Sequence, residues 1–330
     1  MNGLFLVHNL DSPSCRYRVL QYLPHLEQQG VVCDVRRFPK SIGGRLRLFR
    51  RLGDYDFVVI HRKRFGPLWT WYLRRKAKSV VFDFDDAIMF HDSHSTTQQS
   101  SSRRRQFIRM VRAADLVFCG NEFIRRHAAA YNSNSVLLPT VIDVERYPQK
   151  TYADDHKITL GWIGSHSTLP YLRQLSPVFE SLGCLRNDLE LKIVCDRFFD
   201  LQNMPVQKVV WSHETEVAEI QSFDIGLMPL SDDVWSKGKC GLKILQCHAA
   251  GVPVVASPVG ANTKLVEEGL TGWLAATHDD WVEKIERLAD DALGRSRMGR
   301  EGRRRVIESY SVQKHGPLVL QQLRDLAKAA

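Results

Sequence analysis

The chain has 330 residues, of which 44% are hydrophobic and 25% charged, and 46 Lys and Arg against 37 Asp and Glu give a formal charge of +9. This composition is typical of a folded protein of about two domains and excludes a disordered chain. Seven scattered cysteines without a CxxC pair favour neither a disulfide framework nor a zinc site, so we expect a reducing cytoplasm. We expect neither a secretory signal nor a membrane span, because no apolar run approaches about 20 residues.

The excess positive charge lies in the first part of the chain. Residues 1–150 hold 25 Lys and Arg against 13 Asp and Glu, whereas the remainder holds 21 against 24. This asymmetry favours an anionic partner for the first half, either a membrane surface, a lipid-linked pyrophosphate or a nucleic acid. A solvated basic surface that aids solubility is the alternative. We expect no nucleic acid, because the basic residues are spread over many elements and no recognised nucleic-acid-binding motif occurs.

Short apolar runs alternate with helical intervals and predict two parallel-sheet domains in tandem. The predicted strands of the first domain are 4–7, 31–35, 57–60, 79–84, 115–119 and 136–138, and those of the second are 158–163, 189–194, 209–211, 225–230 and 253–256. Residues 149–156, which are polar and aperiodic, are the predicted linker. We therefore expect domains at 1–150 and 151–310, followed by a helix over 311–330 with Pro317 in its first turn.

Two basic segments of the first half carry candidate binding residues. In residues 12–18, SPSCRYR, Arg16 and Arg18 follow the first strand and are predicted to hold an acceptor phosphate through bidentate hydrogen bonds; exposed arginines without that role are the alternative. Residues 61–78 place two tryptophans and a tyrosine between basic clusters, as in a segment that lies at a membrane surface. A helix packed on the core with solvated ends is the competing interpretation.

Acidic residues and a histidine follow the fourth predicted strand. Residues 83–86 read DFDD, and His91 comes shortly after them. We predict that Asp85 and His91 line the acceptor side of a cleft and steer a hydroxyl group. Metal binding by a DxD-like arrangement and simple turn capping by the aspartates are the alternatives. His61, at the end of another strand, is interpreted as an ordinary packed or exposed histidine.

Residues 224–260 read as a strand, a basic loop, a helix and a strand. Gly241 begins the predicted helix and Gly251 ends it. The first free amides of that helix would point toward Lys237, Lys239 and Lys243, so the helix dipole and three ammonium groups predict a diphosphate site. The spacing is not that of a P-loop. Lysines that are merely solvated on a loop are the alternative.

A second glycine-containing turn, GWIGS at residues 161–165, follows the first strand of the second domain. Its glycines allow a ligand to approach the backbone, and a Ser or Thr at 165–168 is expected to cap the next helix. We expect this turn and the basic loop to form opposite walls of one nucleotide pocket at the carboxyl ends of the second sheet.

These motifs resemble those of the retaining glycosyltransferases of family four, which have the two-domain GT-B fold. The similarity covers residues 138–310 and rests on LPTVID, GWIGS, GL followed by QCHAAG, PVVAS, and EEGLTGW. The family usually carries two glutamates eight positions apart, one for the donor sugar and one for the ribose. At the corresponding positions this chain has Gly238 and Gln246.

The resemblance implies an enzyme that moves a sugar from a nucleotide-sugar to an acceptor hydroxyl of a glycan or lipid-linked molecule. From the cysteines and the basic first half we expect this enzyme to be cytoplasmic and peripheral on the inner face of the membrane. The resemblance also implies retention of anomeric configuration, no metal and no other cofactor, with the last helix packed back on the first domain. Gln246 would contact the ribose, and the lysine-rich loop would replace missing family cations. The remaining assigned residues are Gly241, Leu242, Lys239 and Lys243 for the donor, with Lys243 also catalytic, and Gly164 and Ser165 for the phosphate. A catalytically silent nucleotide-sugar sensor or scaffold is the alternative, since both family glutamates are absent.

Overall fold

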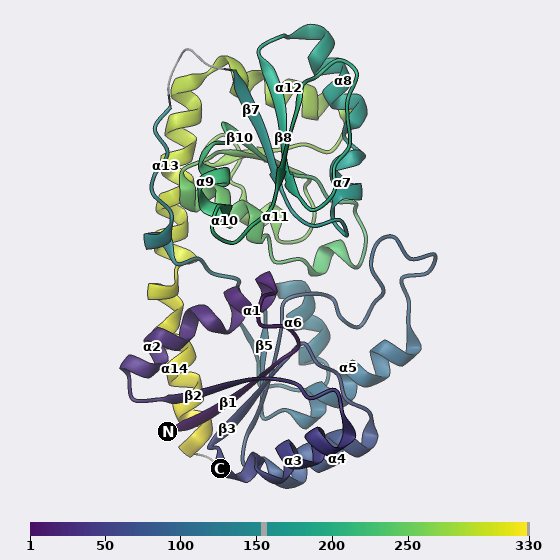
Figure 1. Cartoon of the computed structure of the whole chain (residues 1–330), viewed down its shortest axis with the longest axis vertical. Coiled ribbons are helices and arrows are strands. Elements are labelled where there is room, and N and C mark those ends of the chain that lie inside the picture. The colour runs from purple at the N-terminus through teal and green to yellow at the C-terminus, as the bar shows by residue number, and fades with distance from the viewer. Residues whose placement is uncertain (153–156, 329–330) are drawn as a thin grey trace. The chain divides into compact units, whose positions relative to one another are not determined.

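The computed structural model describes residues 1–152 and 157–328, which form two units, each built on a six-stranded parallel sheet (Figure 1). The first unit contains Met1–Val141, Asp233–Cys240 and the described part of Val312–Ala330, and the second contains the rest. The sequence predicts a division after residue 150, whereas the main stretch of the first unit ends at Val141. Residues 142–152 lie with the second unit because their backbone is bonded there: Ile142 N donates to Tyr310 O, and Lys150 N to Ala250 O, both at 2.8 Å. Residues 153–156 of the predicted linker lie outside the described residues.

The first sheet has the strand order β2-β1-β3-β4-β5-β6, with all neighbours parallel. Its strands are β1 (Asn2–Val7), β2 (Val32–Arg37), β3 (Phe57–His61), β4 (Val80–Phe84), β5 (Leu116–Cys119) and β6 (Ser135–Leu137). Its helices are α1 (Pro13–Arg18), α2 (Leu23–Gln28), α3 (Ile42–Arg50), α4 (Pro67–Lys76), α5 (Ser101–Ala113), α6 (Glu122–Ala129) and α14 (Val312–Lys328). The predicted strands of this half are all present, within a few residues of their expected bounds.

Alternating strand residues supply the two faces of the first sheet. Leu4 and Leu6 of β1 pack with α3, α4, α5 and α6, whereas Phe5 and Val7 face α1, α2 and α14. The last helix α14 packs on α2 and β3 within this unit (Figure 1). The sheet is thus covered on both sides, as the continuous apolar character of its strands requires.

The second sheet has the order β12-β11-β10-β7-β8-β9, again all parallel. Its strands are β7 (Ile158–Ile163), β8 (Leu189–Cys195), β9 (Val206–Val210), β10 (Ile225–Met228), β11 (Val254–Ala256) and β12 (Gly272–Leu274). Its helices are α7 (Leu169–Arg173), α8 (Ser176–Leu185), α9 (Glu216–Gln221), α10 (Leu242–Ala250), α11 (Asn262–Leu265), α12 (His278–Asp290) and α13 (Ala292–Ser309). Strand β12 was not predicted, because a three-residue glycine-containing strand lacks an apolar run.

Each sheet reverses its strand order at one point, and such a switch point opens a crevice at the carboxyl ends of the strands where ligands bind. In the first unit the switch lies between β1 and β3, and in the second between β7 and β10. These two positions are the places to look for functional groups. Among the described helices, none has both the length and the apolar character that crossing a bilayer requires.

Candidate functional site

A hydrogen-bonded network of charged side chains spans the switch point of the first unit. Ser14, in the first turn of α1 after β1, has its Oγ 2.8 Å from Nε2 of His61, the last residue of β3. The same Oγ donates to both carboxylate oxygens of Asp85, at 2.7 and 2.8 Å. The two strands that flank the crevice are therefore joined by a serine, a histidine and an aspartate.

Behind this serine lies a buried ion pair. The second ring nitrogen of His61, Nδ1, is 2.7 Å from Oδ2 of Asp83. Arg18 forms an ion pair with the other oxygen of Asp83 and donates to the carbonyl of Leu138. The side chains of Arg18, His61 and Asp83 are all buried. Burial alone would raise the pKa of Asp83, but the charge of Arg18 and the hydrogen bond from His61 outweigh it and lower that pKa.

The direction of the hydrogen bond between Ser14 and Asp85 follows from the charge on Asp85. Burial opposes ionisation of Asp85, yet the charges of Arg62 and His61 bring its pKa down to about 2. Ionised carboxylates only accept hydrogen bonds. Ser14 therefore gives its one hydroxyl hydrogen to Asp85, and its oxygen lies 2.8 Å from Nε2 of His61. The imidazole thus links Ser14 on one side to Asp83 on the other.

Arg62, directly after His61, completes the cluster. It is the one non-glycine residue with a positive φ, 58°, among the described residues. Its guanidinium pairs with Asp86, and its Nε lies 3.5 Å from Asp85. A side chain in this conformation costs energy, and such strain is concentrated at functional sites. The cluster thus contains two guanidinium groups, an imidazole and three carboxylates at the carboxyl ends of the strands.

Residues 233–240, which we call the inserted segment, fold against these strand ends as part of the first unit. Asn121 caps α6 through its Oδ1 and uses its Nδ2 to hold the carbonyls of Lys237 and Lys239, at 3.1 and 2.9 Å. The Cys240 thiol donates to the carbonyl of Asp85 at 3.1 Å. Burial raises the pKa of Cys240 well above its ordinary value, so the thiol stays protonated and inert.

The tight packing of the inserted segment explains the glycine at position 238. A Cβ added to Gly238 would lie 2.6 Å from the backbone nitrogen of Ala87 and 2.9 Å from its Cα. Ala87 cannot yield, because it sits in the turn that follows β4 and is itself buried. No glutamate fits at this family position while the inserted segment keeps this conformation.

The first-unit residues predicted to contact the acceptor have different environments. Arg18 is 4% exposed, and its guanidinium donates to the carboxylate of Asp83 and to the carbonyl of Leu138. It therefore stabilises the carboxyl ends of the strands and is not available to an acceptor phosphate, which corrects the prediction. Arg16 is half-buried, with its guanidinium carbon 5.4 Å from the ring centre of Tyr17. His91 is half-buried, and its backbone nitrogen donates to Gln98 O. Asp85 lies in the network described above.

In the second unit the predicted donor helix is present. Helix α10 begins after Gly241, whose φ of 68° favours glycine, and ends at Gly251 with φ 78°. The Lys243 ammonium lies 4.7 Å from the ring centre of Trp162, in the strand β7 across the switch point. Because α10 has nine residues and follows β10, its amino-terminal amides and Lys243 lie at the crevice of this sheet.

The turn after β7 reaches the same tryptophan. A Cβ on Gly164 would lie 2.4 Å from Cη2 of Trp162, so only glycine fits there. Ser165 is exposed, and its backbone nitrogen donates to Oγ1 of Thr168 at 3.2 Å. Helix α7 starts only at Leu169 and has no side-chain cap, which differs from the expected capping. Trp162 therefore lies against both Lys243 and the Gly164 turn. The sequence did not indicate this contact, because an apolar residue in a strand is typical of the core.

Two further donor predictions concern Gln246 and the lysines. Gln246 is buried, and its Nε2 donates to the Tyr147 hydroxyl at 3.3 Å. Lys237 and Lys239 belong to the first unit, where the Lys239 ammonium lies 5.5 Å from the Trp235 ring centre. The ribose contact and the convergence of three lysines stay predictions. The described residues contain no group of three or more His, Cys, Asp or Glu suited to a metal ion.

Most of the second unit is similar in sequence to a known protein family. Residues 160–291 match the family model described as Glycosyl transferases group 1. This part of the second unit is thus similar to the glycosyltransferases of group 1. Among curated relatives, the D-inositol 3-phosphate glycosyltransferase of Paenarthrobacter aurescens (strain TC1) is 33% identical over 107 residues, 32% of this chain and 25% of that protein. That of Stackebrandtia nassauensis is 42% identical over 60 residues, 18% of this chain and 14% of that protein. The chain thus matches a quarter or less of the length of these relatives.

Solved glycosyltransferase structures are similar over the whole chain. Sucrose-phosphate synthase from Thermosynechococcus elongatus has a TM-score of 0.75 at 14% identity, covering 100% of both chains. Anabaena HepE in complex with UDP and glucose has a TM-score of 0.72 at 13% identity, covering 98% of this chain and 100% of that one. At these identities the similarity establishes the fold, and the predicted class of two Rossmann-like units in a GT-B architecture is confirmed.

Proposed function

We propose that this protein is a glycosyltransferase that moves a sugar from a nucleotide-sugar to an acceptor hydroxyl. One observation carries the proposal: the amino-terminal end of α10, Lys243 and the Gly164 turn meet around Trp162 at the switch point of the group 1 unit. Helix amides and an ammonium group at such a crevice favour a diphosphate. The UDP and UDP-glucose complexes of Anabaena HepE support a uridine diphosphate sugar as the donor class.

The chemistry follows from where charge develops. As the anomeric bond stretches, negative charge grows on the departing diphosphate, and fixed positive groups lower the barrier. A hydrogen bond to a charged group contributes about 1.5–3 kcal/mol, and removing one preorganised donor costs roughly 10²–10³ in rate. In this mechanism the leaving phosphate accepts the proton of the acceptor hydroxyl, so no carboxylate nucleophile is needed and the configuration is retained. No metal takes part in the proposed reaction.

The acceptor is assigned to the first unit. Ser14 and Asp85 present a hydroxyl and a carboxylate at its switch point, and Arg62 lies beside them. These groups are suited to hold the hydroxyl groups of a glycan or lipid-linked acceptor, with His91 on the turn that follows. The charge on Asp85 is maintained at neutral pH by its neighbours, so it accepts hydrogen bonds without a change of protonation.

The test is a pair of lysine variants. Replacing Lys243 by Ala is expected to weaken UDP binding about tenfold or more in calorimetry and to abolish transfer from UDP-sugars, while circular dichroism stays unchanged. Lys208→Ala removes an ammonium from β9, in the same unit, and serves as the matched control. Undiminished UDP binding and turnover in Lys243→Ala would remove the lysine from the mechanism. A thermal-shift screen with UDP, GDP and dTDP sugars identifies the donor.

A sensor or scaffold that binds a nucleotide-sugar without turnover is the second candidate. The observation that favours it is Gly238, where the family's donor-sugar glutamate is absent and has no room. The two candidates differ in one measurement. A transferase releases free UDP from its donor, whereas a sensor raises the melting temperature with the same donor and leaves it intact.

We also propose that the protein works in the cytoplasm at the inner surface of the membrane. The charge of the first half supports this, because 25 basic against 13 acidic residues favour an anionic surface. Binding to anionic vesicles, lost at high salt, is the expected result.

A further inference from the structure

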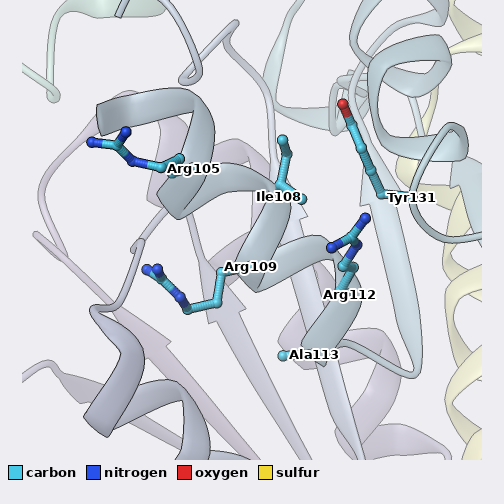
Figure 2. Close-up of a pocket in the computed structure, with 6 residues that line it drawn as sticks. All are labelled: Arg105, Ile108, Arg109, Arg112, Ala113 and Tyr131. Atoms are coloured by element: carbon cyan, nitrogen blue, oxygen red, sulfur yellow. The ribbon is translucent and has the colours of Figure 1, made fainter. Parts of the chain in front are cut away.

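A basic groove lies on the outer surface of the first unit, beside α5. It has a volume of about 570 Å³ and is lined by Arg105, Ile108, Arg109, Arg112, Ala113 and Tyr131 (Figure 2). The three arginines are spaced four and three residues apart, so they recur on one side of α5. Helix α5 runs back from the carboxyl end of β4 and ends at Ala113, near the amino ends of the strands. Ser14 and Asp85 lie at the carboxyl ends of the strands. The groove is therefore separate from the candidate acceptor site.

Tyr131 connects this groove to a second one of about 380 Å³, which is lined in part by Arg104, Arg126 and His127. The Arg112 guanidinium carbon lies 5.4 Å from the Tyr131 ring centre, and Arg104 donates to its hydroxyl at 3.2 Å. Figure 2 shows Arg112 next to Tyr131. Tyr131 is thus held between two arginines that lie about two turns apart on α5.

The charge of the two grooves is unbalanced. Of the residues that line them, none is an aspartate or glutamate, and Arg126 alone is paired, with Glu122 outside the lining. Arg109 donates to the carbonyl of Phe65 at 3.3 Å, which orients its guanidinium without neutralising it. Like charges four residues apart destabilise a helix. A bound anion would remove this repulsion, and bidentate guanidinium groups match phosphate oxygens.

The apolar residues of the groove indicate which chemical groups lie beside the phosphate of a bound ligand. Ile108, Ala113 and the ring of Tyr131 are apolar, so the occupant carries hydrocarbon beside its phosphate. The neighbouring helix α4, which packs on α5, exposes Leu68 and Trp71 to 69% and 61%. Exposed aliphatic and indole groups next to arginines are typical of a surface that enters the headgroup region of a bilayer.

We propose that the α5 groove binds the phosphate headgroups of an anionic phospholipid membrane. This inference deepens the proposed membrane association and is independent of sugar transfer. Arg105, Arg109 and Arg112 bind lipid phosphates, the groove floor contacts the glycerol backbone and the first acyl carbons, and Leu68 and Trp71 insert beside them.

The experiment compares two triple variants of equal charge. Arg105→Gln/Arg109→Gln/Arg112→Gln removes the groove arginines, and Arg47→Gln/Arg50→Gln/Arg51→Gln removes three arginines of the α3 surface in the same unit. Co-sedimentation is measured with phosphatidylcholine vesicles and with vesicles that also contain phosphatidylglycerol. Each arginine near the surface contributes about fivefold, so the groove variant is expected to lose roughly a hundredfold in partition and the control much less. Circular dichroism and UDP binding of both variants are expected to match the wild type. The melting temperature of the groove variant is expected to be unchanged or slightly higher, because the repulsion between the arginines of α5 is removed.

Four outcomes would overturn the proposal. An equal loss of vesicle partition in both variants would mean that the net charge of the protein, and not the groove, binds lipid. A wild-type protein that does not bind anionic vesicles would contradict the membrane association. If free inorganic phosphate or glycerol phosphate displaces the protein from vesicles as effectively as competing vesicles do, the ligand is a soluble phosphate compound. Binding of single-stranded RNA that depends on the same three arginines, without vesicle binding, would identify a nucleic-acid site. UDP binding and turnover are read separately, so a failure here leaves the transfer proposal standing.

Discussion

Asp83 bridges two buried side chains, since one of its oxygens lies 2.7 Å from His61 Nδ1 and the other forms an ion pair with Arg18. The Arg18 side chain is 1% exposed and that of Asp83 3%. A buried ion pair contributes little net stability, but breaking one leaves an uncompensated charge in a poorly solvated place. The loss of Asp83 would therefore leave the Arg18 guanidinium buried without a counter-charge.

We expect Asp83→Asn to lower the free energy of unfolding by about 3–5 kcal/mol, because the asparagine cannot neutralise the buried guanidinium of Arg18. Urea unfolding monitored by tryptophan fluorescence measures it. The control is Asp54→Asn, which breaks the Arg51 pair whose side chains are 59% and 58% exposed, and costs at most about 1 kcal/mol. Equal costs for the two variants would contradict the buried role of Asp83.

Gly238→Ala is expected to destabilise the protein by about 1–3 kcal/mol, because the new Cβ meets the Ala87 backbone. Gly238→Glu, which restores the family residue, is expected to cost more and not to raise turnover. Gly43 in α3 is the matched control: its Cβ position is open, so Gly43→Ala is neutral or stabilising by about 0.5–1 kcal/mol. A stable and more active Gly238→Glu would show that the inserted segment adopts another conformation.

Stability below neutral pH is expected to depend on His248. Burial lowers the pKa of this histidine to about 4, and its Nε2 donates to Thr271 O at 3.1 Å. Because the folded pKa lies below the unfolded value of about 6.5, the unfolded chain binds more protons as the pH falls from about 6.5 to 4. The contribution of neutral His248 to the free energy of unfolding is therefore present above pH 6.5 and is lost as the pH falls from about 6.5 to 4.

Between pH 7 and pH 5 this loss amounts to about 2 kcal/mol. His248→Gln keeps an amide donor for Thr271 and removes the titration, so its unfolding free energy is expected to change less over the same interval. Urea titrations at the two pH values measure the difference. Parallel losses in the variant and the wild type would assign the acid sensitivity to other groups.

Gly299→Ala is expected to lower the free energy of unfolding by about 1–3 kcal/mol through overpacking. The added Cβ would lie 1.9 Å from the carbonyl oxygen of Gly251, a backbone atom at the end of α10. Arg297→Ala, at an exposed position of the same helix α13, should stay within about 0.5 kcal/mol. A thermal melt of both variants tests whether α13 and α10 pack backbone to backbone.

Helix α13 contains three glycines, which have a weak helix propensity. It nevertheless runs unbroken from Ala292 to Ser309 through Gly294, Gly299 and Gly302. Gly299 faces the Gly251 carbonyl, and a Cβ on Gly302 would lie 2.8 Å from the His248 ring. Their small size serves close helix packing, whose benefit exceeds the weak helix propensity of glycine.

The order of apolar runs along the chain determined the two parallel sheets and the position of α10, because burial on both faces and glycine at helix ends are local properties of sequence. Tertiary structure decided what those patterns do not contain. Ser14, His61 and Asp83 are far apart in the chain and meet only because β1, β3 and β4 are neighbours in the sheet. The inserted segment joins the first unit through Asn121 and Ala87, which no local pattern indicates. Such contacts depend on strand order and on space between backbones, and those are set by the packing of the whole sheet.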